Sequence, residues 1–523
     1  MTTIRRVLAA VCLAGVFANS SPAATLRFCA EGSPAGFDPS QTDSGVDFNA
    51  TQQIFSTLIE LERGTTTRIP GLAESWELSA DGKTVIFKLR RGVKFHRTAW
   101  FTPTRDFNAD DVLFTFQRML DAKHPYQKAF PTIAPYMAYM GWDKGVKAVE
   151  KVDEMTVRML LNAPDAAFLN SVSQSFAGIH SAEYAAALLK AGTPQQIMQR
   201  PIGSGPFIFK SYQKGSVLRL TRNPDYFRRE VKLVENLVFS ITPEAIVRAQ
   251  RLRKNECDIG ALAGRLDAQE LARDPNIVLT KEDGLNVGYL AFNTRKPPFD
   301  KPEVRQALEL AIDKKALVDT VYAGSGRLAS SLLPASNWAH DATLKPSAHD
   351  PARARALLKK AGLVSLTMTL WAMPVQRVYN PNAQLMAQMI QADWAAVGVT
   401  AKIVSYEWGE YLKRLDAGEH DAALTGWYAD TEPAGTTGLV SCGANGSTLW
   451  CNKAYDELTQ KARATLDVAQ RKALYAQAQR MVAEQVPLSV IAYGQLVVPT
   501  RKNVLDFRLD AEGNMRFDGV TLK

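Results

Sequence analysis

The clearest hydrophobic pattern in the first third of the chain predicts a β-hairpin. Apolar side chains recur at every second position on both sides of Asp81-Gly82: Trp76 and Leu78 before the pair, and Val85, Phe87 and Leu89 after it. Such alternation around an Asp-Gly pair is a strong hairpin signal. We therefore expect two antiparallel strands within residues 76–95.

Three later segments carry apolar residues at helical spacing. Asn108 precedes the first, and Asp111 stands in a capping-box position three residues later. Residues 300–318 form the second, whose apolar face is Val304, Leu308, Ala311 and Ile312. The third has Asp350 as its cap, Pro351 in the first turn and Gly362 as its stop. Each pattern predicts an amphipathic helix.

Strand candidates lie between the helices of the second half of the chain, at 366–373, 400–406 and 421–428. Alternation of strands and helices predicts an α/β lobe there. The chain has 523 residues, of which 46% are apolar and 22% charged. This is the composition of a soluble globular protein, and the length predicts two or three lobes.

The first 23 residues have a basic start, a short apolar run and a small-residue end. Together these features predict a secretory signal peptide that is removed near Ala23. The apolar run is too short for a membrane anchor. Val11 before Cys12 is the wrong residue for a lipoprotein cleavage site. We expect an exported protein that does not span the membrane.

Four cysteines remain after removal of the signal peptide: Cys29, Cys257, Cys442 and Cys451. An even number in an oxidising compartment predicts two disulfides, and three connectivities are possible. Sequence proximity favours Cys442 with Cys451, which leaves Cys29 for Cys257. Free buried thiols are the alternative.

Known catalytic motifs are missing from the sequence. It contains no HExxH, CxxC, GxSxG or GxxxxGK[ST] pattern, and its six histidines show no metal-ligand spacing. The glycines of GSGRLA at 324–329 follow a helical pattern rather than a strand, so we expect a turn there and not a dinucleotide loop. These observations favour a protein without metal or cofactor that is not an enzyme. A secreted peptidase is the alternative from another class.

Charge also argues against a nucleic-acid partner. The formal net charge is +9, but lysines and arginines are interspersed with acids and form no long basic block. We expect a solvated basic surface.

Four long motifs carry a resemblance to a known family: residues 73–96, PIGSGPF at 201–207, NPDYF at 223–227, and residues 292–314. On these motifs the chain resembles the peptide and nickel class of extracellular solute-binding proteins, family 5, which serve ABC importers. The resemblance runs from about Leu26 to the C-terminus. KNECD at 254–258, GLNVGYL at 284–290 and LWAMPVQRVYNPNA at 370–383 are most similar to the dipeptide-binding subgroup, which also includes proteins implicated in haem and glutathione uptake.

The resemblance implies an α/β fold of the two-lobed, class II type, with a hinge between the lobes and an extra domain on the first lobe. The implied division is 24–56, 201–282 and 495–523 for lobe I, 57–200 for the extra domain, and 283–494 for lobe III. It also implies disulfides between Cys29 and Cys257 within lobe I and between Cys442 and Cys451. The implied function is a monomeric periplasmic receptor that delivers dipeptides or short peptides to an inner-membrane permease.

The resemblance assigns ligand roles to several residues. Arg377 would bind the C-terminal carboxylate of a peptide and Asp430 its α-ammonium. A free peptide is a zwitterion, so a guanidinium fork and a carboxylate suit its two ends. The remaining expected ligand-binding residues are Trp408, Trp427 and Tyr379 as pocket walls, and Ser44 and Gly45 as a loop near the peptide backbone.

Structural roles remain open for the same residues. Arg377 could instead pair with an acid such as Glu432, and Asp430 could cap a turn. Aromatic residues of this kind are more often core than pocket. The segment between Trp427 and Cys442 is shorter than in the dipeptide-binding subgroup. The ligand could therefore differ, and haem or glutathione is the alternative within the class.

Overall fold

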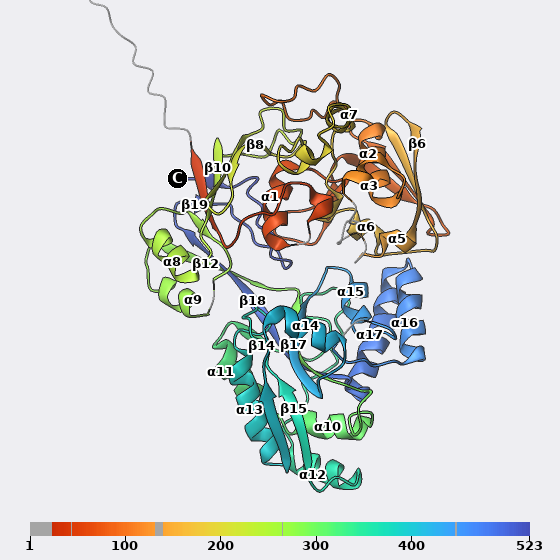
Figure 1. Cartoon of the computed structure of the whole chain (residues 1–523), viewed down its shortest axis with the longest axis vertical. Helices are drawn as coiled ribbons and strands as arrows, with labels where there is room; N and C mark the ends of the chain where they lie inside the picture. The colour runs from red at the N-terminus through yellow and green to blue at the C-terminus, as the bar shows by residue number, and fades with distance from the viewer. Residues whose placement is uncertain (1–23, 43, 131–136, 138–139, 264, 445–446) are drawn as a thin grey trace, which may run out of the picture.

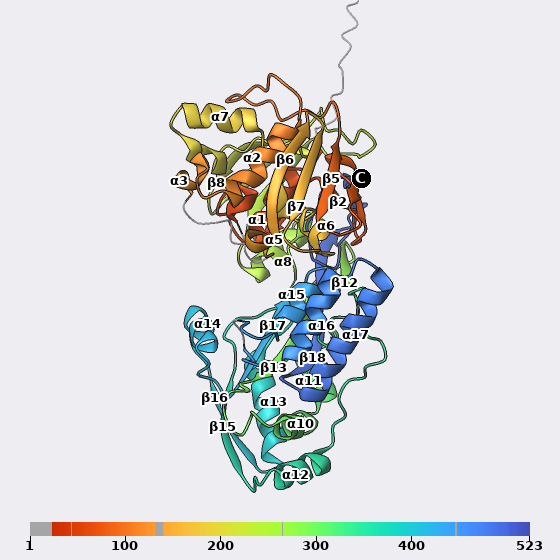
Figure 2. The ribbon, with the colours of Figure 1, turned by 90° about the vertical axis from the view of Figure 1, so that its right-hand side faces the viewer.

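We describe the protein from a computed structural model, for residues 24–42, 44–130, 137, 140–263, 265–444 and 447–523. The predicted signal peptide lies outside the described residues. Figure 1 shows two lobes, one above the other, and Figure 2 shows the same division from the side. Strands of both lobes belong to one long mixed sheet, in the order β16-β15-β17-β13-β18-β11-β1-β10-β9-β8, with β12 and β14 also paired to β18.

Lobe I, in the upper half of Figure 1, contributes one end of this sheet. Its strands are β1 (Thr25–Ala30), β8 (Phe207–Gln213), β9 (Val217–Arg222), β10 (Asn236–Ile241), β11 (Ile259–Gly260) and β12 (Ile277–Asp283), and its helices are α1 (Gly45–Ile54), α8 (Ala245–Arg253) and α9 (Arg265–Leu271). Phe28, Phe239 and Phe517 meet in one core, with ring centroids 5.1 to 5.7 Å apart. Three distant parts of the chain therefore build this lobe. The short strands β19 (Val504–Leu505) and β20 (Thr521–Leu522) pair near the C-terminus.

The extra domain has its own four-stranded sheet, in the order β4-β5-β7-β6. Its strands are β4 (Ala73–Leu78), β5 (Thr84–Leu89), β6 (Val146–Asp153) and β7 (Thr156–Leu161), with the hairpin β2 (Ile59–Leu61) and β3 (Arg68–Pro70) beside them. Its helices are α2 (Ala109–Leu120), α3 (Pro125–Ala129), α5 (Trp142–Gly145), α6 (Phe168–Ser171) and α7 (Ala182–Lys190). The predicted hairpin is confirmed by the pairing of β4 with β5, and Asn108 and Asp111 form the predicted capping box of α2.

Lobe III, in the lower half of Figure 1, surrounds the other end of the long sheet. Its strands are β13 (Asn286–Phe292), β14 (Gly326–Leu328), β15 (Leu366–Trp371), β16 (Val399–Val404) and β17 (Ala422–Tyr428). Its helices are α10 (Pro302–Leu310), α11 (Lys314–Tyr322), α12 (Pro351–Lys360), α13 (Ala383–Ala395), α14 (Trp408–Asp416), α15 (Pro433–Gly438), α16 (Lys453–Ala464) and α17 (Val468–Gln485). The prediction of an α/β lobe is confirmed.

One predicted helix of lobe III is two helices. The apolar face over residues 300–318 is buried as expected, but α10 ends at Leu310 and α11 begins at Lys314. Asp313 causes the break, because its carboxylate accepts a hydrogen bond from Ala316 N at 2.9 Å and so caps a new helix. The third predicted helix is confirmed as α12, with Asp350 capping Arg353 N.

Strand β18 (Leu488–Arg501) crosses from one lobe to the other. Its first half pairs with β13 and β14 of lobe III, and from Gln495 onward it pairs with β12 of lobe I. The chain makes a second crossing between the end of β12 at Asp283 and the start of β13 at Asn286. We call these two crossings, residues 283–286 and 494–495, the hinge.

The side chain of Asn286 joins the two crossings. It is fully buried, it donates from Nδ2 to Gly494 O at 2.8 Å, and its Oδ1 accepts from Gly494 N at 2.8 Å. The amide thus takes the place of a backbone partner for Gly494. Both polar groups of this buried glycine are satisfied by one neutral side chain.

Both predicted disulfides are present. Cys29 bonds to Cys257, with their Cα atoms 5.8 Å apart, and Cys442 bonds to Cys451, with their Cα atoms 4.2 Å apart. The first ties β1 to the segment before β11 inside lobe I. The second closes a short loop before α16 in lobe III.

Candidate functional site

Arg377, the first of the lobe III residues predicted to bind ligand, lies in a tight turn that packs flat on the sheet. Arg377 and Asn380 exchange two backbone hydrogen bonds of 3.0 Å. Beneath the turn, a Cβ atom at Gly288 would overlap the carbonyl oxygen of Tyr379, and one at Gly426 would overlap the Tyr379 ring. These two glycines face each other on β13 and β17. The turn that carries Arg377 approaches the sheet this closely because both positions lack a side chain.

A column of aromatic rings supports the Arg377 guanidinium. Its central carbon lies 5.6 Å from the centroid of the Trp408 ring, and Trp408 stacks on Tyr411 at 5.7 Å. Tyr411 is fully buried, and its hydroxyl donates to Leu424 O on β17 at 2.8 Å. The column therefore fixes the guanidinium to the core of lobe III through a cation–π contact.

Arg377 does not pair with Glu432, the acid considered as its structural partner. Glu432 is bound by Arg471 at 3.0 Å and by Arg68 at 3.3 Å. Within the part of the chain that the structure describes, no carboxylate oxygen lies within 4.0 Å of the Arg377 guanidinium nitrogens. Nη1 donates a long hydrogen bond of 3.4 Å to Gln376 O, and the guanidinium also interacts with the Tyr379 hydroxyl. The donors of this half-buried cation remain available to an anion.

Asp430 lies two residues beyond the end of β17 and is partly exposed. The backbone around it is held to the hinge and to a neighbouring loop: Ala429 N donates to Leu285 O at 2.7 Å, and Asn337 Nδ2 donates to Asp430 O at 3.3 Å. The position of Asp430 is therefore set by the strand before it and by the hinge beside it.

The three aromatic residues predicted as pocket walls differ in exposure. Trp408 and Trp427 are partly buried, and Trp427 also packs against the core around Val287 and Tyr289. Tyr379 is only 5% exposed and lies against Tyr428, with their rings 5.2 Å apart and edge to face. Tyr428 is 47% exposed, so it presents the accessible ring of this pair. Tyr428 was not among the residues predicted to bind ligand, although it ends the same strand as Trp427.

Two charges from opposite lobes act on Tyr428. Burial raises the pKa of its hydroxyl most strongly. A hydrogen bond with the Val378 backbone and then the Arg377 guanidinium lower this pKa, and the Glu31 carboxylate raises it. Glu31 follows β1 in lobe I and is exposed. The Glu31 carboxylate of lobe I is thus close enough to affect Tyr428 of lobe III, and Glu31 is a second candidate that was not among the predicted residues.

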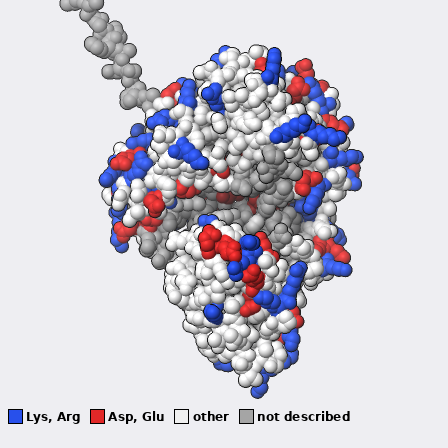
Figure 3. Space-filling view, in the orientation of Figure 1, with Lys and Arg blue, Asp and Glu red and all other residues white. Residues whose placement is uncertain are grey.

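Ser44 and Gly45 form the lobe I side of the predicted site. Ser44 is the N-cap of α1 and accepts a hydrogen bond from Asp47 N at 3.2 Å. Gly45 is exposed, and no atom lies within 4 Å of where its Cβ would be. The first turn of α1 is therefore open to an approaching ligand. The face shown in Figure 3 is hollowed between the two lobes, and its charges are of mixed sign.

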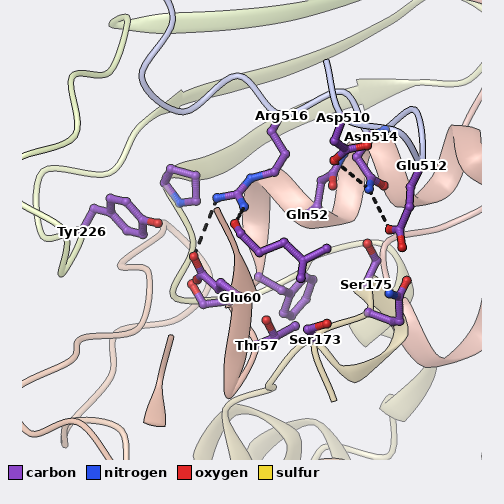
Figure 4. Close-up of a pocket in the computed structure, with 16 residues that line it drawn as sticks. Gln52, Thr57, Glu60, Ser173, Ser175, Tyr226, Asp510, Glu512, Asn514 and Arg516 are labelled. Carbon is purple, nitrogen blue, oxygen red and sulfur yellow. Dashed lines mark hydrogen bonds and ion pairs between the residues drawn. The ribbon is translucent and has the colours of Figure 1, made fainter. Parts of the chain in front are cut away.

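A separate polar cavity of about 60 Å³ lies where lobe I meets the extra domain (Figure 4). It contains none of the predicted ligand-binding residues. Its wall includes Asp510, Glu512, Asn514 and Arg516. Burial, and then repulsion from Glu512, raises the pKa of Asp510 to about 6. Within the described ranges no group of three or more His, Cys, Asp or Glu could hold a metal ion.

None of the helices in the described parts of the chain is long and apolar enough to cross a membrane.

Comparisons with known proteins identify the family. The family described as "Bacterial extracellular solute-binding proteins, family 5 Middle" matches residues 67–447. Di/tripeptide-binding protein 1 of Pseudomonas aeruginosa (strain UCBPP-PA14) is 51% identical over 507 residues, which cover 96% of this chain and 94% of the relative. Heme-binding protein A of Haemophilus influenzae is 40% identical over 512 residues, 97% of this chain and 93% of the relative.

A solved structure shows the same fold. The dipeptide binding protein from Pseudoalteromonas sp. SM9913, in complex with Met-Leu, superposes with a TM-score of 0.82 at 38% identity and covers 95% of this chain and 100% of its own. The two-lobed fold and the expectation of a binding protein rather than an enzyme are confirmed. The chain belongs to the bacterial extracellular solute-binding proteins of family 5.

Proposed function

We propose that this protein captures dipeptides or similarly short peptides in the periplasm and delivers them to an ABC permease in the inner membrane. It would act as a monomer after removal of a signal peptide near Ala23. The observation that carries the proposal is the Arg377 guanidinium, which is fixed on Trp408 and has no carboxylate partner among the described residues. The relatives named for di/tripeptide and dipeptide binding support the same ligand class.

Arg377 would bind the C-terminal carboxylate of the peptide. A guanidinium offers two parallel N–H donors, which match the two oxygens of a carboxylate. Half-burial of the site would strengthen this contact, because water screens it less than at an open surface. Trp408 would hold the fork in place before the ligand arrives.

Asp430 would bind the α-ammonium group from the same lobe. Ligands with both ends fixed are then selected by length, because each additional residue adds about 3.3 Å to an extended chain. Tyr428, Trp408 and Trp427 would flank the ligand, and Ser44 and Gly45 would meet its backbone from lobe I. A ligand that touches both lobes favours the closed form, since only that form makes all of its contacts.

Haem is the second candidate ligand. The relative named for haem binding, at 40% identity, favours it, and the shortened segment between Trp427 and Cys442 leaves room for a ligand other than a dipeptide. Glutathione, with its additional carboxylate, is a third. All three ligands carry carboxylates, but only the peptides and glutathione carry an α-ammonium for Asp430.

Titration calorimetry with free, N-acetylated and C-amidated dipeptides tests the proposal. Asp430→Asn keeps the shape but removes the charge, so binding of free dipeptides should weaken by roughly 3 to 5 kcal/mol, the range for breaking a buried ion pair. Arg377→Ala should reduce the difference in affinity between peptides with a free C-terminus and C-amidated peptides. The matched control is Arg229→Ala, which removes an arginine whose side chain is 64% exposed.

Non-additivity is the sharpest readout. N-acetylated peptides should bind the unaltered protein poorly, and Asp430→Asn should add little further loss for them, because the charge pair is already absent. Equal affinity for free and acetylated peptides, or tighter binding of haem than of any peptide, would contradict the proposal.

A further inference from the structure

The residue directly after Asp430 contacts lobe I. Thr431 is buried, and its backbone N and Oγ1 both donate to Glu512 Oε1, at 3.3 and 2.5 Å. Glu512 belongs to the C-terminal segment that lines the polar cavity of Figure 4. The segment that positions Asp430 is therefore bound to the opposite lobe.

Glu432, the next residue, touches the extra domain. Its side chain is 5% exposed, and its carboxylate is shared by Arg471 of α17 and Arg68 of β3. The Arg471 guanidinium also lies 4.5 Å from the centroid of the Trp338 ring. Arg471 belongs to lobe III, whereas Arg68 belongs to the hairpin beside the extra domain. One buried carboxylate thus bridges two parts of the molecule.

A second ion pair joins the same two parts. Arg463 at the end of α16 contacts Asp165 of the extra domain, with Nη2 2.7 Å from Oδ2. Its backbone oxygen accepts a hydrogen bond from Ala166 N at 2.9 Å. Figure 1 shows α16 and α17 reaching the end of the extra domain that carries α5 and α6. The chain passes from the extra domain to lobe III only by way of lobe I, so these contacts join two parts of the molecule that no chain segment connects directly.

We propose that Glu432 with Arg68 and Arg471, together with Asp165 and Arg463, forms an ionic clasp that holds lobe III against the extra domain and sets the balance between the open and closed forms. Rotation about the hinge separates lobe III from the extra domain, which breaks the contacts of Arg68 with Glu432 and of Asp165 with Arg463 and leaves the Glu432–Arg471 pair within lobe III. The side chains of Arg68 and Arg463 are 30% and 43% exposed, so water can replace their partners when the clasp opens. The more exposed Arg463–Asp165 pair contributes little to stability, and Glu432 keeps its buried partner Arg471 when Arg68 moves away, so both contacts suit a joint that must release.

The inference does not depend on what Asp430 binds, so its test uses the ligand-free protein. Spin labels on Val152→Cys in the extra domain and Val364→Cys in lobe III would report the separation of the two parts, because these residues are 54% and 95% exposed. The four cysteines of the mature chain are in disulfides and do not compete for label. Pulsed electron spin resonance then gives the distance distribution.

Two variants remove one clasp contact each without leaving a buried ion unpaired. Arg68→Gln leaves Glu432 bound to Arg471. Asp165→Asn keeps the side-chain oxygen that caps Ala167 N at 3.0 Å. The control is Arg158→Gln, which breaks a 2.6 Å ion pair with Glu150 inside the sheet of the extra domain.

Both clasp variants should increase the population at longer distances, and the control should not. For any ligand that binds, each clasp variant should also speed release by about fivefold, the change expected for a pair worth about 1 kcal/mol. Unchanged distance distributions in both clasp variants, or an equal shift in the control, would overturn the clasp. Failure of the unaltered protein to bind peptides would count against the proposed function only, since the distances are measured without ligand.

Discussion

The hinge and the ionic clasp both join lobe III to the rest of the molecule, but they are built from opposite kinds of contact. At the hinge the chain itself crosses twice, and the neutral, fully buried amide of Asn286 satisfies both polar groups of Gly494. At the clasp, charged side chains meet across segments that no chain connection joins directly, and in each of the two contacts at least the arginine is partly exposed.

The difference follows from what each joint must do. Breaking a buried neutral hydrogen bond leaves polar groups that water cannot reach, so the hydrogen bonds of such a joint persist while the lobes move. Breaking a partly exposed ion pair lets water solvate both charges, so its net contribution is small and reversible. We infer that the molecule bends about the first and releases at the second.

The largest effect should come from replacing the hinge amide. Asn286→Leu keeps the volume but leaves the N–H and C=O of Gly494 buried without partners, which should lower the free energy of unfolding by about 4 kcal/mol. Urea unfolding followed by circular dichroism measures it. The same replacement at Asn162, which is exposed and donates to Lys144 O, should cost about 1 kcal/mol or less. Equal losses at both positions would mean that Asn286 has no special role in the hinge.

A smaller effect on the free energy of unfolding, and one that depends on pH, is expected at Asp510, whose carboxylate is repelled by that of Glu512, the partner of Thr431. The pKa of Asp510 is raised to about 6 from an ordinary value of 3.8. The folded protein therefore holds the proton of Asp510 more tightly than the unfolded chain does. The stability that this difference contributes is present below about pH 4 and is lost as pH rises through 6. The gap of about two pKa units corresponds to at most about 3 kcal/mol at pH 7.

Asp510→Asn should remove this pH dependence. At pH 7.5 removal of the buried charge should raise the free energy of unfolding. The replacement also weakens the hydrogen bonds of 3.1 Å with Asn514, which offsets part of this gain and leaves about 2 kcal/mol. Below pH 4 it should bring no gain. Denaturant unfolding at the two pH values measures both, with Asp225→Asn, at a side chain that is 51% exposed, as control. An equal gain at both pH values would show that ionisation of Asp510 is not the cause.

The smallest effect is the response to salt, which should weaken the clasp and leave the hinge unchanged. Raising NaCl from about 0.1 M to about 1 M shortens the Debye length from about 10 Å to about 3 Å. The open population of the spin-labelled protein should rise by the equivalent of less than about 1 kcal/mol. Hydrogen exchange at the Gly494 amide should not change, since its partner is neutral and buried. Faster exchange in step with opening would show that the two joints are not independent.

Local signals in the sequence predicted local structure well. The alternation around Asp81-Gly82, the capping box at Asn108 and the cap at Asp350 each depend on residues within a few positions of one another, and each is confirmed. The same kind of signal failed over residues 300–318, because the helical pattern of apolar residues continues through the new cap at Asp313. The family motifs pointed to Arg377 and Asp430, but no local pattern could place Tyr428 against Tyr379 or Glu31 across from it.

The sequence by itself determined most of the local elements and the family, since these are written in neighbouring residues or in long ordered motifs. It predicted an export signal, and it left the pairing of the four cysteines open until the family resemblance favoured one connectivity. Only the tertiary structure decided that β18 belongs to both lobes, that Glu432 serves Arg471 and Arg68 rather than Arg377, and that Trp408 supports the free guanidinium. These contacts join residues that lie far apart along the chain. Their energies depend on burial and on distances that exist only after the lobes have folded and met.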